Sequence, residues 1–450
     1  MRKKGGIFVK VRFIFSVLLH SIIVSFIANS FVFIKQTPES LFALIPIFLL
    51  TNIFAGTLFL RSKSRRIEVC QHGTVLLYSF YVSLLSSLIY HIMLAFKTIP
   101  DDYVTLIWSI VLCVGVNFIV FWNGIICVYV TSMQLGLKLR IIGLICGLIP
   151  IANLVALFFI IKATTYECLV EQKKERINKK RQDEQVCATK YPILLVHGIF
   201  FRDTKYFNYW GRIPKELEAN GAQIFYGNHS SAASVADSAA ELKKRIMETL
   251  AESGAKKVNI IAHSKGGLDC RYALSEPGLA SCVASLTTIN TPHKGCLFAD
   301  YLLTKISPDI QVKIAETYNS VLKKFGEKHT DFLAAVNDLT DSRCAQLNFE
   351  ISDPEGVYCQ SFGSVMPKPG SGKFPLNFSY RLAKHFDGAN DGLVSENSFA
   401  WGENYTLLRP CGKRGISHGD MIDLNRQNIR GFDVREFYVH LVNDLKDKGL

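Results

Sequence analysis

The sequence predicts two structural classes in one chain: an all-α bundle of apolar helices, followed by an α/β domain with a mostly parallel sheet. Long apolar runs fill the first third of the 450 residues, whereas short buried-strand patterns alternate with amphipathic helix patterns from Tyr191 onward. Charge divides the chain in the same way, because residues 1–170 hold 14 Lys/Arg and 5 Asp/Glu, a net of +9 of the total +13. These observations predict a transmembrane helical domain at 1–165, a charged linker at 166–188 and an α/β domain at 189–450.

Five N-terminal runs are apolar enough, and long enough, to cross a bilayer, which takes about 20 residues each. The first run is too long and too weakly terminated for a signal peptide, and four more follow it. We therefore expect five membrane spans. They are Val11–Ile34, Ser40–Leu60, Thr74–Phe96, Val104–Tyr129 and Ile141–Ile161.

Basic residues lie in the short loops between these runs, as the positive-inside rule predicts for a membrane protein. A nucleic-acid partner would need basic residues clustered on a folded face, and the sequence after residue 186 contains no such cluster. A cytoplasmic N-terminus followed by five spans would place the α/β domain outside the cell membrane. The segment 171–185, "EQKKERINKKRQDEQ", disagrees, because its Lys and Arg residues directly follow the last span.

The twelve cysteines show neither a CxxC pair nor a zinc-ligand spacing. In a chain of this size such scattered cysteines favour buried, reduced thiols over a disulfide framework.

A single serine follows a strand pattern in "VNIIAHSKGG", residues 258–267. Small residues two positions before and two after Ser264 allow a sharp turn from strand to helix, which exposes the hydroxyl at the end of the sheet. Here the first small residue is Ala262 rather than the more usual glycine. This pattern predicts a nucleophile elbow with Ser264 at its apex.

A serine nucleophile needs a base, and the base needs a carboxylate, in the chain order Ser, acid, His. Downstream of Ser264, Asp391 lies in a tight-turn pattern and His418 lies in a Gly/Ser-rich loop before the last amphipathic helix. We predict the triad Ser264, Asp391 and His418. Asp387 and Glu396 remain alternative acids.

An oxyanion formed on the substrate needs two backbone N–H donors. The expected donors are Lys265, which directly follows the nucleophile, and Ile199, in the loop after the first strand. Aromatic residues crowd that loop, and they predict either simple packing or an apolar wall for an acyl chain. They are Phe200, Phe201, Tyr206, Phe207, Tyr209 and Trp210.

Five motifs in order, "YPILLVHGIF", "VNIIAHSKGG", "TINTPHKG", "GANDGLVS" and "ISHGDMID", resemble those of bacterial triacylglycerol lipases of the α/β-hydrolase fold. The similarity covers about 190–450 and does not extend to the apolar runs. The resemblance implies hydrolysis of carboxylic esters with no cofactor required for the chemistry. It also implies a structural calcium ion near the histidine loop, for which Asp420 matches one carboxylate ligand.

An insertion at about 297–355 separates the serine from the acid and shows helical patterns with apolar stripes. It predicts either extra core helices or a cap that shields an acyl chain from water. The expected function is that of a membrane-anchored serine hydrolase with a lipid or other acyl-ester substrate and a bilayer as its surroundings. Acyl transfer on the same fold, or a membrane sensor or scaffold with an inert hydrolase domain, are the alternatives.

Overall fold

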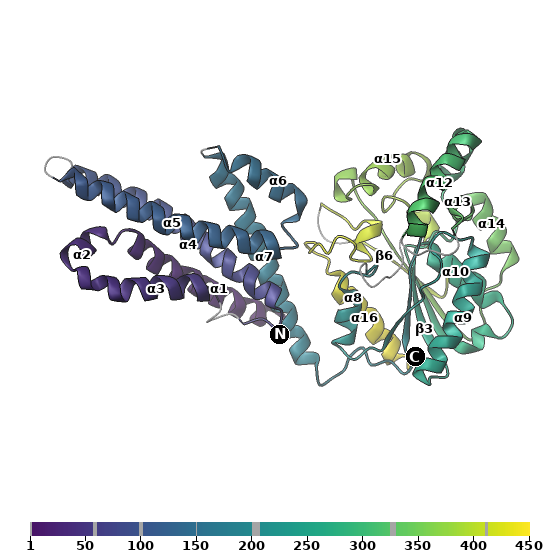
Figure 1. The fold of residues 1–450 in the computed structure, drawn as a ribbon. Coiled ribbons are helices and arrows are strands. Elements are labelled where there is room, and N and C mark those ends of the chain that lie inside the picture. The colour runs from purple at the N-terminus through teal and green to yellow at the C-terminus, as the bar shows by residue number, and fades with distance from the viewer. Residues whose placement is uncertain are drawn as a thin grey trace. The chain divides into compact units, whose positions relative to one another are not determined.

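The computed structural model describes residues 2–56, 61–98, 102–149, 151–199, 208–324, 330–409 and 413–450. The chain divides into two compact units, Met1–Lys180 and Arg181–Leu450. Helix α7 runs through the boundary between them. Figure 1 shows the fold of each unit.

A six-stranded sheet forms the centre of the second unit, with the strand order β2-β1-β3-β4-β5-β6. All five neighbouring pairs are parallel, which confirms the predicted parallel sheet. The strands are β1 (Ile193–Val196), β2 (Ile224–Tyr226), β3 (Val258–His263), β4 (Val283–Ile289), β5 (Tyr358–Ser364) and β6 (Asn404–Leu408).

Helices cover both faces of this sheet because successive side chains of each strand point to opposite faces. Ile193 and Leu195 of β1 pack in one apolar cluster with α8 (Ile213–Glu218) and α16 (Val434–Asp447). Leu194 and Val196 pack on the other face with α9 (Val235–Ser253) and α10 (Lys265–Ser275). Buried on both faces, the central strands are rich in apolar residues, as parallel strands usually are, with a few buried polar side chains such as Asn259 and Ser285 among them.

Between β4 and β5 the predicted insertion folds as four helices. They are α11 (Leu297–Lys305), α12 (Pro308–Lys324), α13 (Phe332–Asn337) and α14 (Asp341–Glu350). A further helix, α15 (Leu376–Asp387), follows β5. Ala315 of α12 and Phe332 of α13 form a buried cluster with Ile199, so this cap packs on the loop that follows β1.

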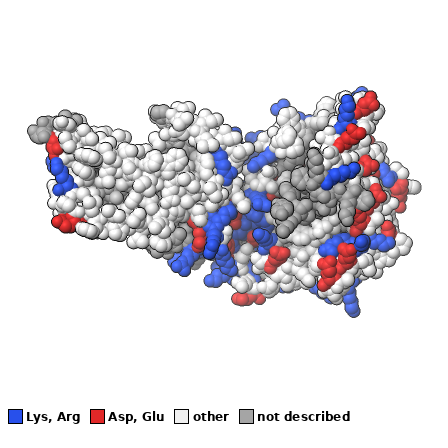
Figure 2. Space-filling model, viewed as in Figure 1, with Lys and Arg blue, Asp and Glu red and all other residues white. Residues whose placement is uncertain are grey.

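The first unit consists of apolar helices, and four of them are long and apolar enough to cross a membrane by length and composition. Its middle is almost free of charged side chains (Figure 2). The helices are α1 (Arg2–Ala28), α2 (Phe31–Gln36), α3 (Leu41–Phe54), α4 (Arg65–Thr98), α5 (Tyr103–Thr131), α6 (Gly136–Cys146) and α7 (Ala152–Arg181).

Two of the five predicted runs do not form long helices. The second run gives the shorter apolar helix Pro38–Phe54. The fifth is divided, because α6 ends at Cys146 and α7 begins at Ala152, with Pro150 in the sequence between them. A proline disfavours helical conformation in the residue before it, which explains the break. The segment 171–185, expected as a solvated helix or tether, continues α7 as helix up to Arg181.

Contacts within the first unit bring several basic segments to one end of the bundle. Glu167 of α7 pairs with Arg66 of α4 and accepts hydrogen bonds from Ser132 and Gln134, in the turn after α5. At the opposite end, Lys35 pairs with Asp102 at a distance of 2.7 Å.

Every described cysteine is a free thiol.

Candidate active site

Ser264 lies between the end of β3 and the start of α10, as the elbow pattern predicts. Its backbone has φ 55° and ψ −132°, a conformation that L residues rarely adopt and that costs of order 1–3 kcal/mol. The surrounding structure holds it there, since the Ser264 amide donates to the Ile289 carbonyl of β4 at 2.9 Å. Strain concentrated at one serine, at the carboxyl end of a parallel sheet, is typical of a nucleophile.

Three glycines make this elbow possible because no Cβ fits at their positions. A Cβ on Gly266 would lie 2.3 Å from the His197 carbonyl oxygen, and one on Gly267 would lie 2.1 Å from Thr291 Oγ1. A Cβ on Gly198 would lie 2.7 Å from the Cβ of Ser264. The loop after β1 and the elbow therefore approach each other backbone to backbone.

Asp391 and His418 meet although 26 residues separate them in the sequence. Asp391 Oδ2 and His418 Nδ1 are 2.6 Å apart, and the two residues are joined again by a bond from the His418 amide to the Asp391 carbonyl, at 2.9 Å. The aspartate is fully buried and the histidine nearly so. A carboxylate on Nδ1 leaves Nε2 as the free base of the imidazole, which is the arrangement that general-base catalysis needs.

The carboxylate of Asp391 is held by more donors than the sequence predicted. Its Oδ1 accepts the amides of Leu393 and Val394, and its Oδ2 also accepts the side-chain amide of Asn290 at 2.5 Å. Asn290 has a positive φ of 49° and a second bond to Ser364. These donors fix the direction in which the carboxylate faces His418.

The two alternative acids have other partners. Asp387 accepts the amides of Leu297 and Phe298 at the start of α11, and partial burial raises the pKa of its carboxyl. Glu396 forms an ion pair with Arg409. Neither hydrogen bonds to His418 in the part of the chain that the structure describes.

No hydrogen bond joins the side chains of Ser264 and His418 among the described residues. The ring of His263, which precedes the serine, has its centroid 4.4 Å from that of His418. Catalytic hydrogen bonds are often long before substrate binds and tighten in the complex. The structure therefore places the imidazole, with its carboxylate, against the residue that precedes the strained serine.

The two predicted oxyanion donors also lie at this point. Lys265 opens α10, where backbone N–H groups have no partner within the helix. Ile199 follows Gly198, whose close approach to Ser264 brings the loop beside the nucleophile. Of the aromatic residues of this loop, Phe200, Phe201, Tyr206 and Phe207 lie outside the described residues, whereas Tyr209 and Trp210 are buried.

The side chain of Lys265 turns away from the site into a buried polar cluster. Its Nζ lies 2.6 Å from Asp269 Oδ1 and 3.0 Å from Ser238 Oγ, and His229 Nε2 lies 3.3 Å from the other oxygen of Asp269. Burial raises the pKa of Asp269 to about 6, and burial lowers the pKa of His229 to about 3. The histidine is thus neutral near pH 7, and the Lys265–Asp269 pair carries the charge.

Asp420 does not fit the calcium ligand that the resemblance implies. Both its oxygens bond to Arg414, at 3.0 and 3.1 Å, and one also accepts from the amide and hydroxyl of Ser417. The described residues contain no group of three or more His, Cys, Asp or Glu side chains placed to hold a metal ion. An arginine thus occupies the side of the carboxylate that a cation would need.

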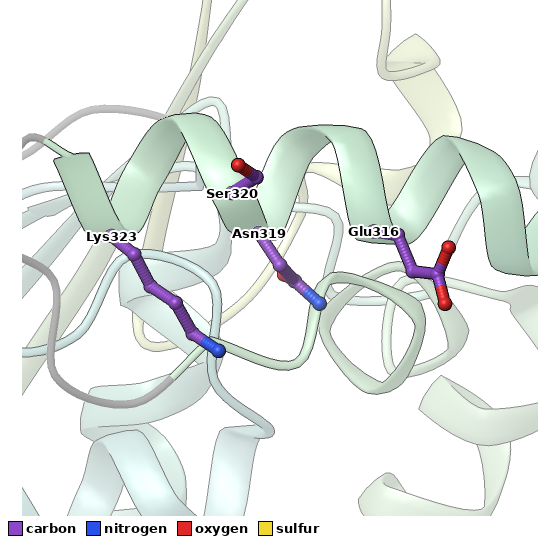
Figure 3. A pocket seen from close by; sticks show the side chains of 4 residues that line it. All are labelled: Glu316, Asn319, Ser320 and Lys323. Atoms are coloured by element: carbon purple, nitrogen blue, oxygen red, sulfur yellow. The ribbon is translucent and has the colours of Figure 1, made fainter.

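A cavity of about 580 Å³ lies against the cap helix α12 (Figure 3). Its described lining is polar and comes from one helix: Glu316, Asn319, Ser320 and Lys323. None of Ser264, Asp391 or His418 belongs to that lining.

Sequence reasoning missed Asn290, His263 and Tyr209 as parts of the site. Their positions give the only signal: Asn290 directly follows β4, at the same sheet edge as Ser264, and His263 directly precedes the nucleophile. For Tyr209 the sequence contained no signal other than the aromatic residues around it, because the contacts of its hydroxyl depend on the tertiary fold.

No protein-family model matches the chain. A triacylglycerol lipase of Pseudarthrobacter phenanthrenivorans is 35% identical over 175 residues, which cover 36% of this chain and 54% of that protein. A triacylglycerol lipase of Vibrio cholerae is 38% identical over 185 residues, covering 39% of this chain and 58% of that one. Triacylglycerol lipase 2 of Saccharomyces cerevisiae is 27% identical over 269 residues, covering 55% of this chain and 77% of that protein.

A lipase and a carboxyl esterase are among the solved structures that are similar to this chain. Bacillus licheniformis lipase BlEst2 in mature form has a TM-score of 0.42 at 22% identity, over 57% of this chain and 92% of that one. The metagenomic carboxyl esterase MGS0156 has a TM-score of 0.43 at 16% identity, over 58% of this chain and 76% of that one. The chain spans about half the length of the bacterial lipases that it matches. The parallel sheet with helices on both faces confirms the predicted α/β-hydrolase fold, and the C-terminal part of the chain is homologous to the triacylglycerol lipases.

Proposed function

We propose that this chain is a membrane-anchored serine hydrolase that cleaves carboxylic esters of lipid or other acyl substrates. The observation that carries the proposal is the buried Asp391–His418 pair, whose imidazole packs on His263, the residue before a serine in a strained strand-to-helix turn. Homology to triacylglycerol lipases supports an ester substrate, and four long apolar helices support an anchor in a bilayer.

In the proposed reaction Ser264 Oγ attacks the ester carbonyl carbon while its proton passes to His418 Nε2. The carbonyl oxygen becomes an oxyanion that accepts hydrogen bonds from the amides of Ile199 and Lys265, and Asp391 stabilises the imidazolium. The carbon–oxygen ester bond then breaks, and His418 returns the proton to the leaving alcohol. Water, deprotonated by His418, attacks the acyl-enzyme in the same way and releases the acid.

The test uses the full-length protein in detergent micelles with p-nitrophenyl esters from acetate to palmitate, and Ser264→Ala as control. Release of nitrophenol that disappears in the Ser264→Ala variant would support the proposal, and the preferred chain length would separate a lipase from an esterase. A folded protein that cleaves none of these esters would contradict it. Addition of an alcohol acceptor tests acyl transfer, since a transferase would form a new ester at the expense of free acid.

We also propose that the hydrolase unit faces the cytoplasm, in place of the extracellular side expected from five spans. Glu167 of α7 lies at the end of the bundle where α4 begins and α5 ends. With 11 residues, α6 extends roughly 16 Å, about half of the ~30 Å hydrocarbon core. We infer that α6 and the first half of α7 form a hairpin that enters and leaves at that same end.

The crossings are then those of α1, Pro38–Phe54, α4 and α5, an even number that returns the chain to the side of its N-terminus. That side carries Arg61, Lys63, Arg65 and Arg66, and the Lys- and Arg-rich end of α7 as well. The positive-inside rule makes it the cytoplasmic side, so the basic segment 171–185 no longer disagrees with the topology.

A further inference from the structure

One buried hydroxyl connects two parts of the candidate active site. Tyr209 Oη accepts the amide of Gly198 at 3.0 Å, and it lies 2.7 Å from His263 Nδ1. Gly198 precedes the predicted oxyanion donor Ile199, and His263 precedes Ser264. Tyr209 therefore connects the loop after β1 to the nucleophile elbow, and its side chain is buried, with 3% exposed.

The direction of these hydrogen bonds follows from their chemistry. A backbone N–H can only donate, so the tyrosine oxygen is the acceptor for Gly198 and its own hydrogen can go to Nδ1 of His263. His263 then carries its proton on Nε2. In that neutral tautomer the hydroxyl donates to Nδ1, whereas in a protonated His263 Nδ1–H would be the donor and the hydroxyl hydrogen would have to turn away to another acceptor.

The neutrality of His263 bears on catalysis because its ring centroid lies 4.4 Å from that of His418. His418 becomes an imidazolium during the proposed reaction, and a second positive charge at this distance would oppose that step. Burial, together with the neighbouring His418, holds the pKa of His263 well below its ordinary value.

We propose that Tyr209 is a positioning residue of the hydrolase site: its hydroxyl holds the Gly198 loop against the Ser264 elbow and fixes His263 in its neutral tautomer. This inference rests on the proposed function, because it concerns the same reaction. Tyr209 acts through Gly198 and His263 and touches neither substrate nor the reacting atoms. Its loss should therefore reduce the rate of the chemical step more than it reduces substrate binding.

The test is Tyr209→Phe in the full-length protein, with Tyr438→Phe as the matched control. Tyr438 is fully buried in the same apolar cluster as Tyr209, and its hydroxyl has no hydrogen-bond partner among the described residues. Both variants remove one buried hydroxyl and keep the ring. We expect Tyr209→Phe to lower kcat about 10- to 100-fold with KM within about twofold, since small displacements of reacting groups cost rates of this order. Tyr438→Phe should keep the wild-type kcat.

Three results would overturn the inference. The first is an unchanged kcat in Tyr209→Phe while Ser264→Ala is inactive, which would leave the proposed function intact. The second is an equal loss of kcat in the two tyrosine variants, which would indicate a general effect on the core. The third is an inactive wild-type protein whose Ser264 also fails to react with a fluorophosphonate, which would overturn the proposed function together with this inference. Thermal unfolding of each variant separates a loss of rate from a loss of folded protein.

Discussion

Asp391 and Asp387 are both buried at least in part and both lie near the cap, yet their partners assign them different roles. Asp391 contacts His418, whereas Asp387 caps the first amides of α11. We expect Asp391→Asn to lower kcat about 10⁴-fold, because the neutral amide no longer holds the productive tautomer of the imidazole. Asp387→Asn should leave kcat close to wild type. Ester hydrolysis by the two variants, assayed side by side, measures this difference, and a loss confined to Asp387→Asn would reassign the acid.

The Lys265–Asp269 pair has both side chains 1% exposed, so each charge depends on the other. We expect Asp269→Leu to lower the free energy of unfolding by about 3–5 kcal/mol, because it leaves the ammonium group buried without its counter-charge. The double variant Lys265→Met/Asp269→Leu should recover most of that loss, since it removes both charges.

Urea unfolding of the single and double variants measures the effect. Ester hydrolysis by the double variant adds a second readout, because the proposed oxyanion donor is the Lys265 amide, which the Met substitution retains. A double variant as unstable as Asp269→Leu would show that His229 and Ser238, rather than the lysine charge, determine the stability of the cluster.

At this scale the sequence could propose Ser264, Asp391 and His418 because each lies in a short motif and the three follow the chain order of one known mechanism. It could not identify Asn290 or Tyr209, since their functional contacts join segments that are far apart in sequence. It also could not show that Arg414 binds Asp420, because the spacing of six residues within an irregular loop does not reveal which side chains meet, and there the resemblance implied a metal ion.

The loop that carries His418 is held by two arginine–carboxylate pairs. Arg414 binds Asp420 with two hydrogen bonds, and Arg212 binds Asp423 through its side chain and its backbone amide. Paired guanidinium and carboxylate groups fix both distance and plane, which suits the support of a catalytic histidine. These two pairs therefore give the loop the kind of support that a bound cation would give.

We expect ester hydrolysis to be insensitive to EDTA and to added calcium, because Arg414 already occupies the Asp420 carboxylate. Asp420→Asn should lower the free energy of unfolding by about 1–3 kcal/mol, since it breaks charge-assisted bonds to Arg414 and Ser417. Activity assays after chelation and urea unfolding test the two parts. Inactivation by EDTA that calcium reverses would contradict the first part and would restore the calcium hypothesis.

Elements that bury a regular apolar pattern were predicted well: the strands around "YPILLVHG", "VNIIAHS" and "VASLTTINTP" all belong to the sheet. The lengths of the helices in the second and fifth apolar runs were not predicted, because apolar composition alone does not separate a long span from shorter helices joined by a turn. Pro150 was the available signal for the break between α6 and α7. The segment 171–185 has no apolar face, so its pattern did not show that α7 would continue as helix to Arg181.

On the scale of the whole molecule, the distribution of basic residues and the proposed even number of membrane crossings both predict a hydrolase unit on the cytoplasmic side. The end of the bundle marked by the Arg66–Glu167 pair carries an excess of Lys and Arg over acidic residues, whereas the end marked by Lys35 and Asp102 has no such excess. A hydrolase on the cytoplasmic face would take acyl esters from the inner leaflet or from the cytoplasm. The sidedness of the chain thus limits the substrates it can meet.

Reporter fusions in a bacterial host test this topology. We expect green fluorescent protein fused after Leu450 to fluoresce and alkaline phosphatase fused at the same position to be inactive, because the latter folds only outside the cytoplasm. The matched control is a pair of fusions after Lys97, at the end of α4, where the chain has crossed an odd number of times and the two reporters should give the reverse result. Active phosphatase after both Lys97 and Leu450 would mean that the segment from α5 to α7 crosses an even number of times. In that case α6 and α7 would include a full span rather than a hairpin, and the hydrolase unit would face the outside as five spans require.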